Sequence, residues 1–319
     1  QKKLDTIILA KSYRRIGDTK KAERARQCGE YLTFQECPHG HYKKLNQANF
    51  CRLRLCPMCS WRRSLKLVNQ LRLITHEANQ RRQLKWLFLT LTVRNVDGNL
   101  LSDEITHIFQ SWQRLSQRKV FRQSVVGWFR ALEVTINMQN WNYHPHLHVL
   151  LAVQPSYFSG AKYISQDRWV SLWQESLRVD YIPIVDIRTV KPKRNRNREN
   201  KILERQEQAL HSAVLEAAKY PVKFNNYIIK GDTHSTDQIV KVLDKSLSYR
   251  RLIAYGGLLK LIWNELRQGG IIEEIDESHN TTPVELNMNE DCQCPTCGSD
   301  MLEHMYTWNI GVSNYIKIL

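Results

Sequence analysis

The fold is decided by one stretch of the chain, His144-Pro145-His146-Leu147-His148-Val149-Leu150-Leu151. Successive side chains of a β-strand point to opposite faces, so a strand here places His146 and His148 on one face and Leu147 in the core. Two neighbouring imidazoles are suitable ligands for a divalent metal ion. The alternative, a polar strand end that faces water, does not explain histidines at a period of two.

The preceding strand offers a third ligand. Strands are expected at Gly127–Asn137 and His146–Val153, and a hairpin would pair them. Because Leu132 and Val134 would face the core, Glu133 can lie beside the two histidines. Taken alone, an acid in a strand is more often simply solvated.

The pattern continues outward on both sides. The run Trp86–Arg94 alternates large and small side chains, as a central strand does. The order of elements is β-α-β-β-α-β-α, which indicates an α+β fold with one antiparallel sheet and helices packed on one face. The remaining expected elements are helices at Ser60–Gln83, Ser102–Arg118, Ser165–Arg178 and Lys201–Tyr220, a strand at Ile182–Val190 and a turn at Gln139–Pro145.

A glutamate and a tyrosine lie at the end of the last expected helix. Glu216 and Tyr220 are four residues apart, which would place them on one helical face, and Pro221 ends the helix. A phenol can attack phosphorus when a metal polarises the phosphate and cations such as Lys219 and Lys223 stabilise the phenolate. A tyrosine at a helix end usually packs or caps. A catalytic interpretation of this pair therefore depends on the histidine strand in the same chain.

Composition favours a nucleic-acid partner. The 319 residues are 42% hydrophobic, enough for a globular core, and the 47 Lys and Arg exceed the 31 Asp and Glu by 16. A positive field of this size suits a polyanion, with a membrane surface as the weaker alternative. No apolar stretch is long enough to cross a bilayer and residues 1–19 lack a signal-peptide core, so we expect a cytosolic protein.

Eight cysteines in short spacings predict metal binding rather than disulfides in a reducing compartment. Cys56 and Cys59 form a knuckle that needs two more ligands to close a tetrahedral structural zinc site. Cys28, Cys37 and Cys51 compete for these two places. A second candidate zinc site near the other end of the chain comprises Cys292, Cys294, Cys297 and His304.

Basic side chains mark candidate DNA contacts. Arginines surround the first cysteine knuckle, and a loop dense in Lys, Arg and Asn precedes the last expected helix. Such residues could bind backbone phosphates, although a solvated basic face explains any single one of them equally well. The candidates are Arg52, Arg54, Arg62 and Arg63 at the knuckle, Lys193, Arg194 and Arg196 in the loop, and Lys219 and Lys223 beside Tyr220.

These motifs, in this order, resemble the single-tyrosine HUH endonucleases, specifically the initiators of rolling-circle plasmid replication. Four ordered motifs are far more specific than any one of them, and the resemblance spans roughly Cys28 to Lys260. It rests on Phe88–Thr92, Leu132–Thr135, Pro145–Leu150 and Glu216–Tyr220, together with Asn49–Cys59 upstream.

The resemblance implies an activity, a DNA nickase and strand transferase. Tyr220 would nick one strand at the plasmid's double-strand origin, become linked to the 5′-phosphate and leave a 3′-hydroxyl for a host polymerase. Glu216 would activate a water or assist strand transfer when the round terminates. A host helicase is the implied partner, since a nick does not unwind DNA.

The resemblance also implies the cofactors. His146 and His148, with Glu133 as the third ligand, would hold Mg²⁺ or Mn²⁺ as a Lewis acid, and the two imidazoles suit Mn²⁺ better. His144 would lie behind these ligands. Cys28 and Cys51 would be the companions of the Cys56–Cys59 knuckle in a structural Zn²⁺ site.

Three parts of the chain are therefore expected. Residues 1–63 would form a basic zinc-binding module, residues 64–230 an HUH nicking domain, and residues 231–319 a helical region with the second zinc ribbon. In this interpretation the protein acts in the bacterial cytoplasm on origin DNA and single-stranded DNA.

Other classes of protein remain as alternatives. A single-strand transposase or a conjugative relaxase would use the same HUH chemistry. A histidine-triad nucleotide hydrolase would use the histidine strand but needs neither zinc modules nor a tyrosine helix. A zinc-containing DNA-binding repressor would explain the charge and the cysteines but not the histidines, Glu133 and Tyr220.

Overall fold

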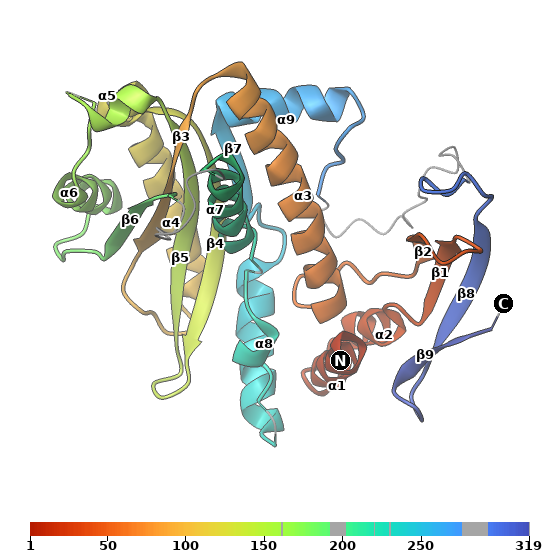
Figure 1. Cartoon of the computed structure of the whole chain (residues 1–319). Coiled ribbons are helices and arrows are strands. Elements are labelled where there is room, and N and C mark those ends of the chain that lie inside the picture. The colour runs from red at the N-terminus through yellow and green to blue at the C-terminus, as the bar shows by residue number, and fades with distance from the viewer. Residues whose placement is uncertain (161, 192–201, 220, 230, 276–292, 319) are drawn as a thin grey trace. The chain divides into compact units, whose positions relative to one another are not determined.

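The computed structural model describes residues 1–160, 162–191, 202–219, 221–229, 231–275 and 293–318 (Figure 1). The chain divides into two compact units. The larger comprises residues 62–227 and 242–277, and the smaller comprises residues 1–61, 228–241 and 278–319. This differs from the expected three parts, because the region after residue 230 contributes to both units instead of forming a third.

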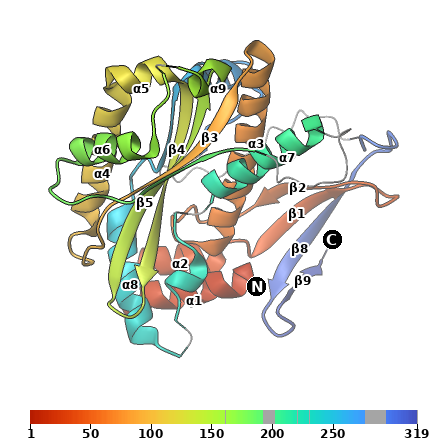
Figure 2. The same cartoon turned by 60° about the vertical axis from the view of Figure 1, so that its left-hand side comes forward.

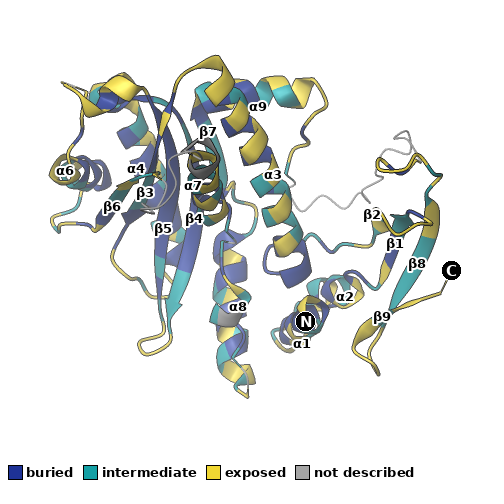
Figure 3. Cartoon of the chain, viewed as in Figure 1, coloured by how far each residue is buried: buried dark blue, intermediate teal, exposed yellow. Residues whose placement is uncertain are grey.

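The larger unit is built on a five-stranded antiparallel sheet, in the order β6-β3-β5-β4-β7 (Figure 2). The central strand β5 is buried from Pro145 to Val153 (Figure 3). The strands are β3 (Lys85–Thr92), β4 (Val125–Asn137), β5 (Asn142–Val153), β6 (Val185–Thr189) and β7 (Ile253–Gly257).

Helices cover both faces of this sheet (Figures 1 and 2). Residues of α3, α7 and α9 pack with Phe129 and Leu150 on one face, whereas α4 and α6 lie on the other, where Trp173 donates a hydrogen bond to the carbonyl of Thr92. The prediction of helices on one face was wrong. The signal against it was the unbroken apolar run at the end of β5, since strands buried on both faces show no alternation.

The helices differ from the predicted ranges by a few residues at their ends, as such boundaries usually do. Two of them, α3 and α8, contain residues of both units. The α-helices beyond the first two are α3 (Pro57–Arg81), α4 (Leu101–Gln117), α5 (Lys119–Ser124), α6 (Gln166–Leu177), α7 (Ile202–Ala217), α8 (Thr233–Leu247) and α9 (Leu258–Gln268), with 3₁₀ turns η1 (Pro155–Phe158) and η3 (Phe224–Asn226).

The hairpin of β4 and β5 is longer than predicted, because Pro145 lies inside β5 opposite Val134. Val134 donates its N–H to the carbonyl of Pro221 on the other side of β4. The Val134–Pro145 pair is therefore not hydrogen-bonded within the hairpin. An N–H at position 145 would point toward β3, but β3 ends at Thr92, opposite His146, so the proline breaks no hydrogen bond of the sheet. Residues 138–141 form the connection instead of the predicted turn.

The smaller unit contains a four-stranded antiparallel sheet in the order β2-β1-β8-β9. Its central pair joins opposite ends of the sequence, since Tyr31 of β1 is opposite Thr307 of β8. The last described residues thus form a β-hairpin rather than a helical region. The elements are α1 (Lys2–Arg15), α2 (Thr19–Gln27), β1 (Tyr31–Glu36), β2 (Lys43–Ala48), β8 (Leu302–Asn309) and β9 (Asn314–Lys317).

None of the described helices combines the length and the apolar character that crossing a membrane requires.

Candidate metal centre and active site

Three potential metal ligands converge on the sheet face that also carries α3, α7 and α9. Glu133 of β4 is opposite His146 of β5, and His148 lies two residues further along. Nε2 of His148 lies 2.8 Å, and Nε2 of His146 3.5 Å, from Oε2 of Glu133. All three side chains are buried, with ligand atoms within 4.8 Å of one another. Strand alternation and hairpin register thus bring the predicted set together.

Hydrogen bonds on the far side of each ring orient the two histidines. Nδ1 of His146 lies 3.1 Å from the carbonyl oxygen of His144, and Nδ1 of His148 lies 3.3 Å from Oγ1 of Thr90. In the absence of an ion, a protonated Nε2 of His148 donates to the Glu133 carboxylate at 2.8 Å. With an ion bound, protons on Nδ1 would leave both Nε2 lone pairs for the metal. Sequence reasoning gave Thr90 no role, although Thr90 and Thr92 alternate with leucines and are opposite His148 and His146 in register.

The carboxyl of Glu133 is ionised in this setting. Burial by itself would raise its pKa, but the hydrogen bonds and charges of His146 and His148 outweigh burial and hold the pKa well below its usual value. Nζ of Lys223 lies 3.9 Å from Oε1 of Glu133 and adds a further positive charge. The carboxylate is therefore in the form that binds a metal ion.

This donor set fits a divalent ion. Ligand atoms about 2.1 Å from an ion in octahedral coordination are about 3 Å apart when adjacent, close to the separations of Glu133 from the two histidines. Two imidazole nitrogens and one carboxylate oxygen suit Mn²⁺ better than Mg²⁺. Three protein ligands also leave positions for water or a phosphate oxygen, as catalytic sites require.

His144 packs against this group but is not one of its three candidate ligands. Its ring stacks on that of His146, with centroids 5.3 Å apart, but the cluster of ligand atoms consists of Glu133, His146 and His148. Burial, followed by the charge of His146, lowers the pKa of His144. His144 therefore packs against the ring of a candidate ligand, and its role behind that ligand stays a prediction.

Helix α7 ends at Ala217, three residues before its predicted end. In a continued helix, the carbonyl of Ala217 would accept a hydrogen bond from residue 221, which is a proline without an N–H. The argument that Glu216 and Tyr220 share a helical face therefore does not hold. Glu216 instead forms an ion pair with Lys219, and Tyr220 lies outside the described residues.

The chain directly after Tyr220 lies against the strand that carries Glu133. The carbonyl of Pro221 accepts the N–H of Val134 at 2.7 Å, and Val134 follows Glu133 in β4. Consecutive Cα atoms are about 3.8 Å apart. This hydrogen bond therefore joins the residue that follows Tyr220 to the residue that follows Glu133, a predicted metal ligand.

Four buried cysteines form a separate group in the smaller unit. Sγ of Cys28 lies 3.6 Å from Sγ of Cys56 and Sγ of Cys59, and Cys51 is 3.6 Å from Cys59. Sulfurs around a tetrahedral Zn²⁺, each about 2.3 Å from the ion, are about 3.8 Å apart, whereas disulfide sulfurs are about 2.05 Å apart. Cys28 and Cys51, rather than Cys37, accompany the knuckle.

Backbone N–H groups point at two of these sulfurs. The N–H groups of Cys51 and Arg52 point at Sγ of Cys28 and Cys59, at 3.4 and 3.3 Å. Cys59 lies in the first turn of α3, near the positive end of the helix dipole. A closed set of four thiolates suits a structural zinc ion.

The second predicted zinc set is only partly assembled. Cys294 and Cys297 come together, but with Cys37 and His41. His304 lies elsewhere, with Nδ1 3.2 Å from the carboxylate of Glu36, because its place in β8 is set by pairing with β1. Cys292 lies outside the described residues.

The predicted DNA-contacting residues have different environments. Arg54 is only 5% exposed, so the prediction that it contacts DNA was wrong, whereas Arg52, Arg62 and Arg63 are partly exposed. Lys219 is paired with Glu216, and Lys223 lies near Glu133 with a half-exposed side chain. The basic loop residues Lys193, Arg194 and Arg196 lie outside the described residues.

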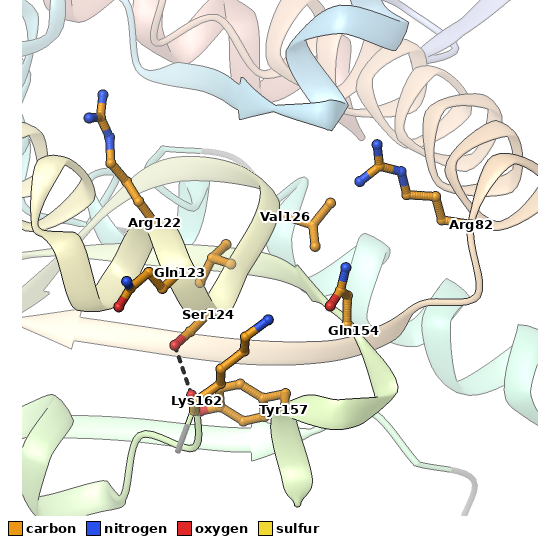
Figure 4. Close-up of a pocket in the computed structure, with 9 residues that line it drawn as sticks. Arg82, Arg122, Gln123, Ser124, Val126, Gln154, Tyr157 and Lys162 are labelled. Carbon is orange, nitrogen blue, oxygen red and sulfur yellow. Dashed lines mark hydrogen bonds between the residues drawn. The ribbon is translucent and has the colours of Figure 1, made fainter. Parts of the chain in front are cut away.

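A cationic cavity of 270 Å³ opens where β4 begins and β5 ends. Figure 4 shows Arg82, Arg122 and Lys162 around it, together with Gln154 and Tyr157. None of the described residues that line it carries a carboxylate, so it suits an anion such as a DNA phosphate. It is adjacent to Val125, eight residues along β4 from Glu133, and so is separate from the metal ligands.

Comparison with known proteins identifies the family. Residues 42–316 match the Rep_1 family, described as replication protein. The chain is 41% identical to Protein rep of Bacillus amyloliquefaciens over 99% of this chain and 92% of the relative. It is 46% identical to Protein rep of a Bacillus species over 78% and 82%, and 40% identical to Protein rep of Streptococcus pneumoniae over 85% and 80%. No solved structure matches significantly. The chain therefore belongs to the Rep_1 family of replication proteins.

Proposed function

We propose that this chain initiates rolling-circle replication of a plasmid by nicking one strand of the double-strand origin with Tyr220. In this proposal the five-stranded sheet is the palm of an HUH endonuclease. The observation that carries it is the hydrogen bond between Val134 and Pro221, since it holds the neighbours of Glu133 and Tyr220 together. Family membership supports a role in replication.

The metal centre would consist of Glu133, His146 and His148 with Mn²⁺ or Mg²⁺. A bound divalent ion supplies Lewis-acid polarisation of the scissile phosphate. The hydrogen bonds to Thr90 and to the carbonyl of His144 hold the two rings in place before DNA arrives, so little reorganisation is needed on binding.

The cleavage step is a transesterification. The phenol oxygen of Tyr220 forms a bond to phosphorus, and the bond from phosphorus to the 3′-oxygen breaks. The phenol loses its proton and the leaving 3′-oxygen gains one, so no water is consumed and the energy of the phosphodiester is retained. Lys223 would stabilise the phenolate, and Glu216, once released from Lys219, would activate the acceptor at termination.

Zinc and arginines would serve origin binding. A structural Zn²⁺ held by Cys28, Cys51, Cys56 and Cys59 would order the start of α3. Arg52, Arg62 and Arg63 would contact phosphates of the origin duplex. A host helicase would then separate the strands from the nick.

The test is capture of the covalent intermediate. The protein is incubated with labelled single-stranded origin DNA and Mn²⁺, and a denaturing gel is searched for a protein–DNA adduct. We expect an adduct with the wild type and with Tyr163→Phe, which changes an exposed tyrosine of the same unit, and none with Tyr220→Phe. An adduct in Tyr220→Phe would show that another residue is the nucleophile.

A second variant separates the enzyme from a repressor. His146→Gln should abolish the adduct while origin duplex binding persists. Full cleavage by this variant would mean that the histidine group is structural. Nicking that requires no plasmid origin would favour a transposase or a relaxase instead.

A further inference from the structure

Four residues from opposite ends of the chain gather at one edge of the smaller unit. Cys37 and His41 belong to the turn between β1 and β2, and Cys294 and Cys297 precede β8. Their ligand atoms all lie within 4.8 Å of one another. The proposed nicking reaction gives this group no role.

The separations fit a tetrahedral metal site. Sγ of Cys37 lies 3.6 Å from Sγ of Cys297 and 3.7 Å from Nδ1 of His41. Two sulfurs bound to Zn²⁺ are about 3.8 Å apart, and a sulfur and an imidazole nitrogen about 3.5 Å. The separation is too long for a disulfide, and all three cysteines are free.

Two similar turns present the ligands. Gly40 has φ +73° and donates its N–H to the carbonyl of Cys37 at 2.9 Å. Gly298 has φ +68° and donates to the carbonyl of Cys294 at 2.8 Å. The positive φ, which glycine adopts without strain, lets each chain fold back so that both ligands of its turn face the same side.

Strand pairing places these two turns beside each other. Glu36 of β1 is opposite Leu302 of β8, so the residue after β1 and the residues before β8 meet at the same edge. Cys294 is 2% and Cys37 5% exposed, while His41 and Cys297 are exposed. The site is therefore enclosed on one side and reachable by an ion from the other.

We propose that Cys37, His41, Cys294 and Cys297 bind a second structural zinc ion, which fastens the C-terminal hairpin β8–β9 to the N-terminal hairpin β1–β2. Four protein ligands complete a tetrahedral shell and leave no position for substrate, so the ion is structural. The proposal does not depend on the nicking activity.

Zinc content of the full chain is the first test. We expect two zinc ions per chain by elemental analysis and native mass spectrometry, and one in Cys297→Ser and in His41→Gln. The matched controls Cys292→Ser and His39→Gln should retain two. A wild type with one zinc ion overturns the proposal, as does a His41→Gln variant with two.

Thiol protection in the unmodified chain is the second test, in case a variant misfolds. Because Cys297 is exposed, it should react rapidly with an alkylating agent unless a metal holds it. We expect protection in the zinc-loaded protein and alkylation, located by peptide mass mapping, after chelation. Alkylation of Cys297 in the zinc-loaded chain would contradict the proposal. Neither test measures DNA cleavage, so nicking can fail or succeed separately.

Discussion

The two units hold candidate metal ligands in different ways. In the larger unit, Glu133, His146 and His148 project from paired strands of a sheet that is packed on both faces. In the smaller unit, two groups of four candidate ligands project mainly from turns and from the start of a helix. The first set mixes nitrogen and oxygen donors, and the others are rich in sulfur.

In the larger unit the fold positions the candidate ligands. In the smaller unit a bound ion would instead stabilise the fold. The sheet positions Glu133 and the histidines through strand pairing and hydrogen bonds, so these ligands need no ion to stay together. The four buried cysteines also receive N–H groups, at Sγ of Cys28 and Cys59, but a zinc ion bound to them would add folding free energy directly. Removing an ion should therefore impair chemistry in one unit and stability in the other.

The largest effect is expected at the four-cysteine group. Cys28→Ser removes a fully buried ligand from a site type whose apparent zinc-binding free energy is about 10–16 kcal/mol in small zinc domains. We expect loss of one zinc ion and unfolding of the smaller unit, seen as rapid hydrogen exchange in α1 and α2. Retention of zinc with slow exchange would refute the structural role.

The next effect is catalytic. His148→Gln keeps the side-chain size but removes an imidazole ligand, and loss of several kcal/mol of transition-state stabilisation corresponds to about a 10³-fold slower nicking rate. Single-turnover cleavage should show this decrease, with hydrogen exchange in the smaller unit unchanged. If exchange there increased instead, the proposed contrast between the units would be lost.

A smaller effect is expected behind the ligands. His144→Gln removes the ring that stacks on His146, and losing a residue that orients a ligand typically costs about 10- to 100-fold in metal affinity or activity. We expect about 10-fold slower nicking at low Mn²⁺ and recovery at high Mn²⁺. Failure to recover would place His144 among the reacting groups rather than behind a ligand.

The smallest effect concerns the cationic cavity. Arg122→Ala should remove about one phosphate contact, and the slope of log affinity against log salt for single-stranded DNA should fall in magnitude by about 0.7. Titrations by fluorescence anisotropy at several salt concentrations measure it. An unchanged slope would exclude the cavity of Arg82, Arg122 and Lys162 from the DNA surface, whereas nicking of bound DNA should be unaffected.

Much of the sheet and its ligands could be predicted from local patterns. The period of two in His146–His148 and the position of Glu133 between two apolar residues were enough to place three side chains on one face. The same reasoning wrongly placed Pro145 in a turn. A proline is tolerated inside β5 at this position because β3 has already ended, and the local sequence does not show where β3 ends. The same reasoning also missed the helices on the second face, which require knowledge of what packs there.

The remaining site residues could not be predicted, because their positions depend on contacts between residues far apart in the sequence. The Cys56–Cys59 spacing indicates a knuckle, but nothing local distinguishes Cys28 from Cys37 as its companion. The helical spacing of Glu216 and Tyr220 suggested a shared face, yet Pro221 ends α7 early and pairs with Val134 instead.

The sequence alone supplied the residue types on which the proposed chemistry depends: two histidines, a carboxylate and a tyrosine in a fixed order, eight cysteines and a surplus of positive charge. Residue type and strand period are local properties, so one chain is enough to detect them. Only the tertiary structure decided which cysteines share a site, because Cys37 and Cys294 are brought together by the pairing of β1 with β8. A contact between the two ends of a chain is set by the free energy of the whole sheet, and no local pattern encodes it.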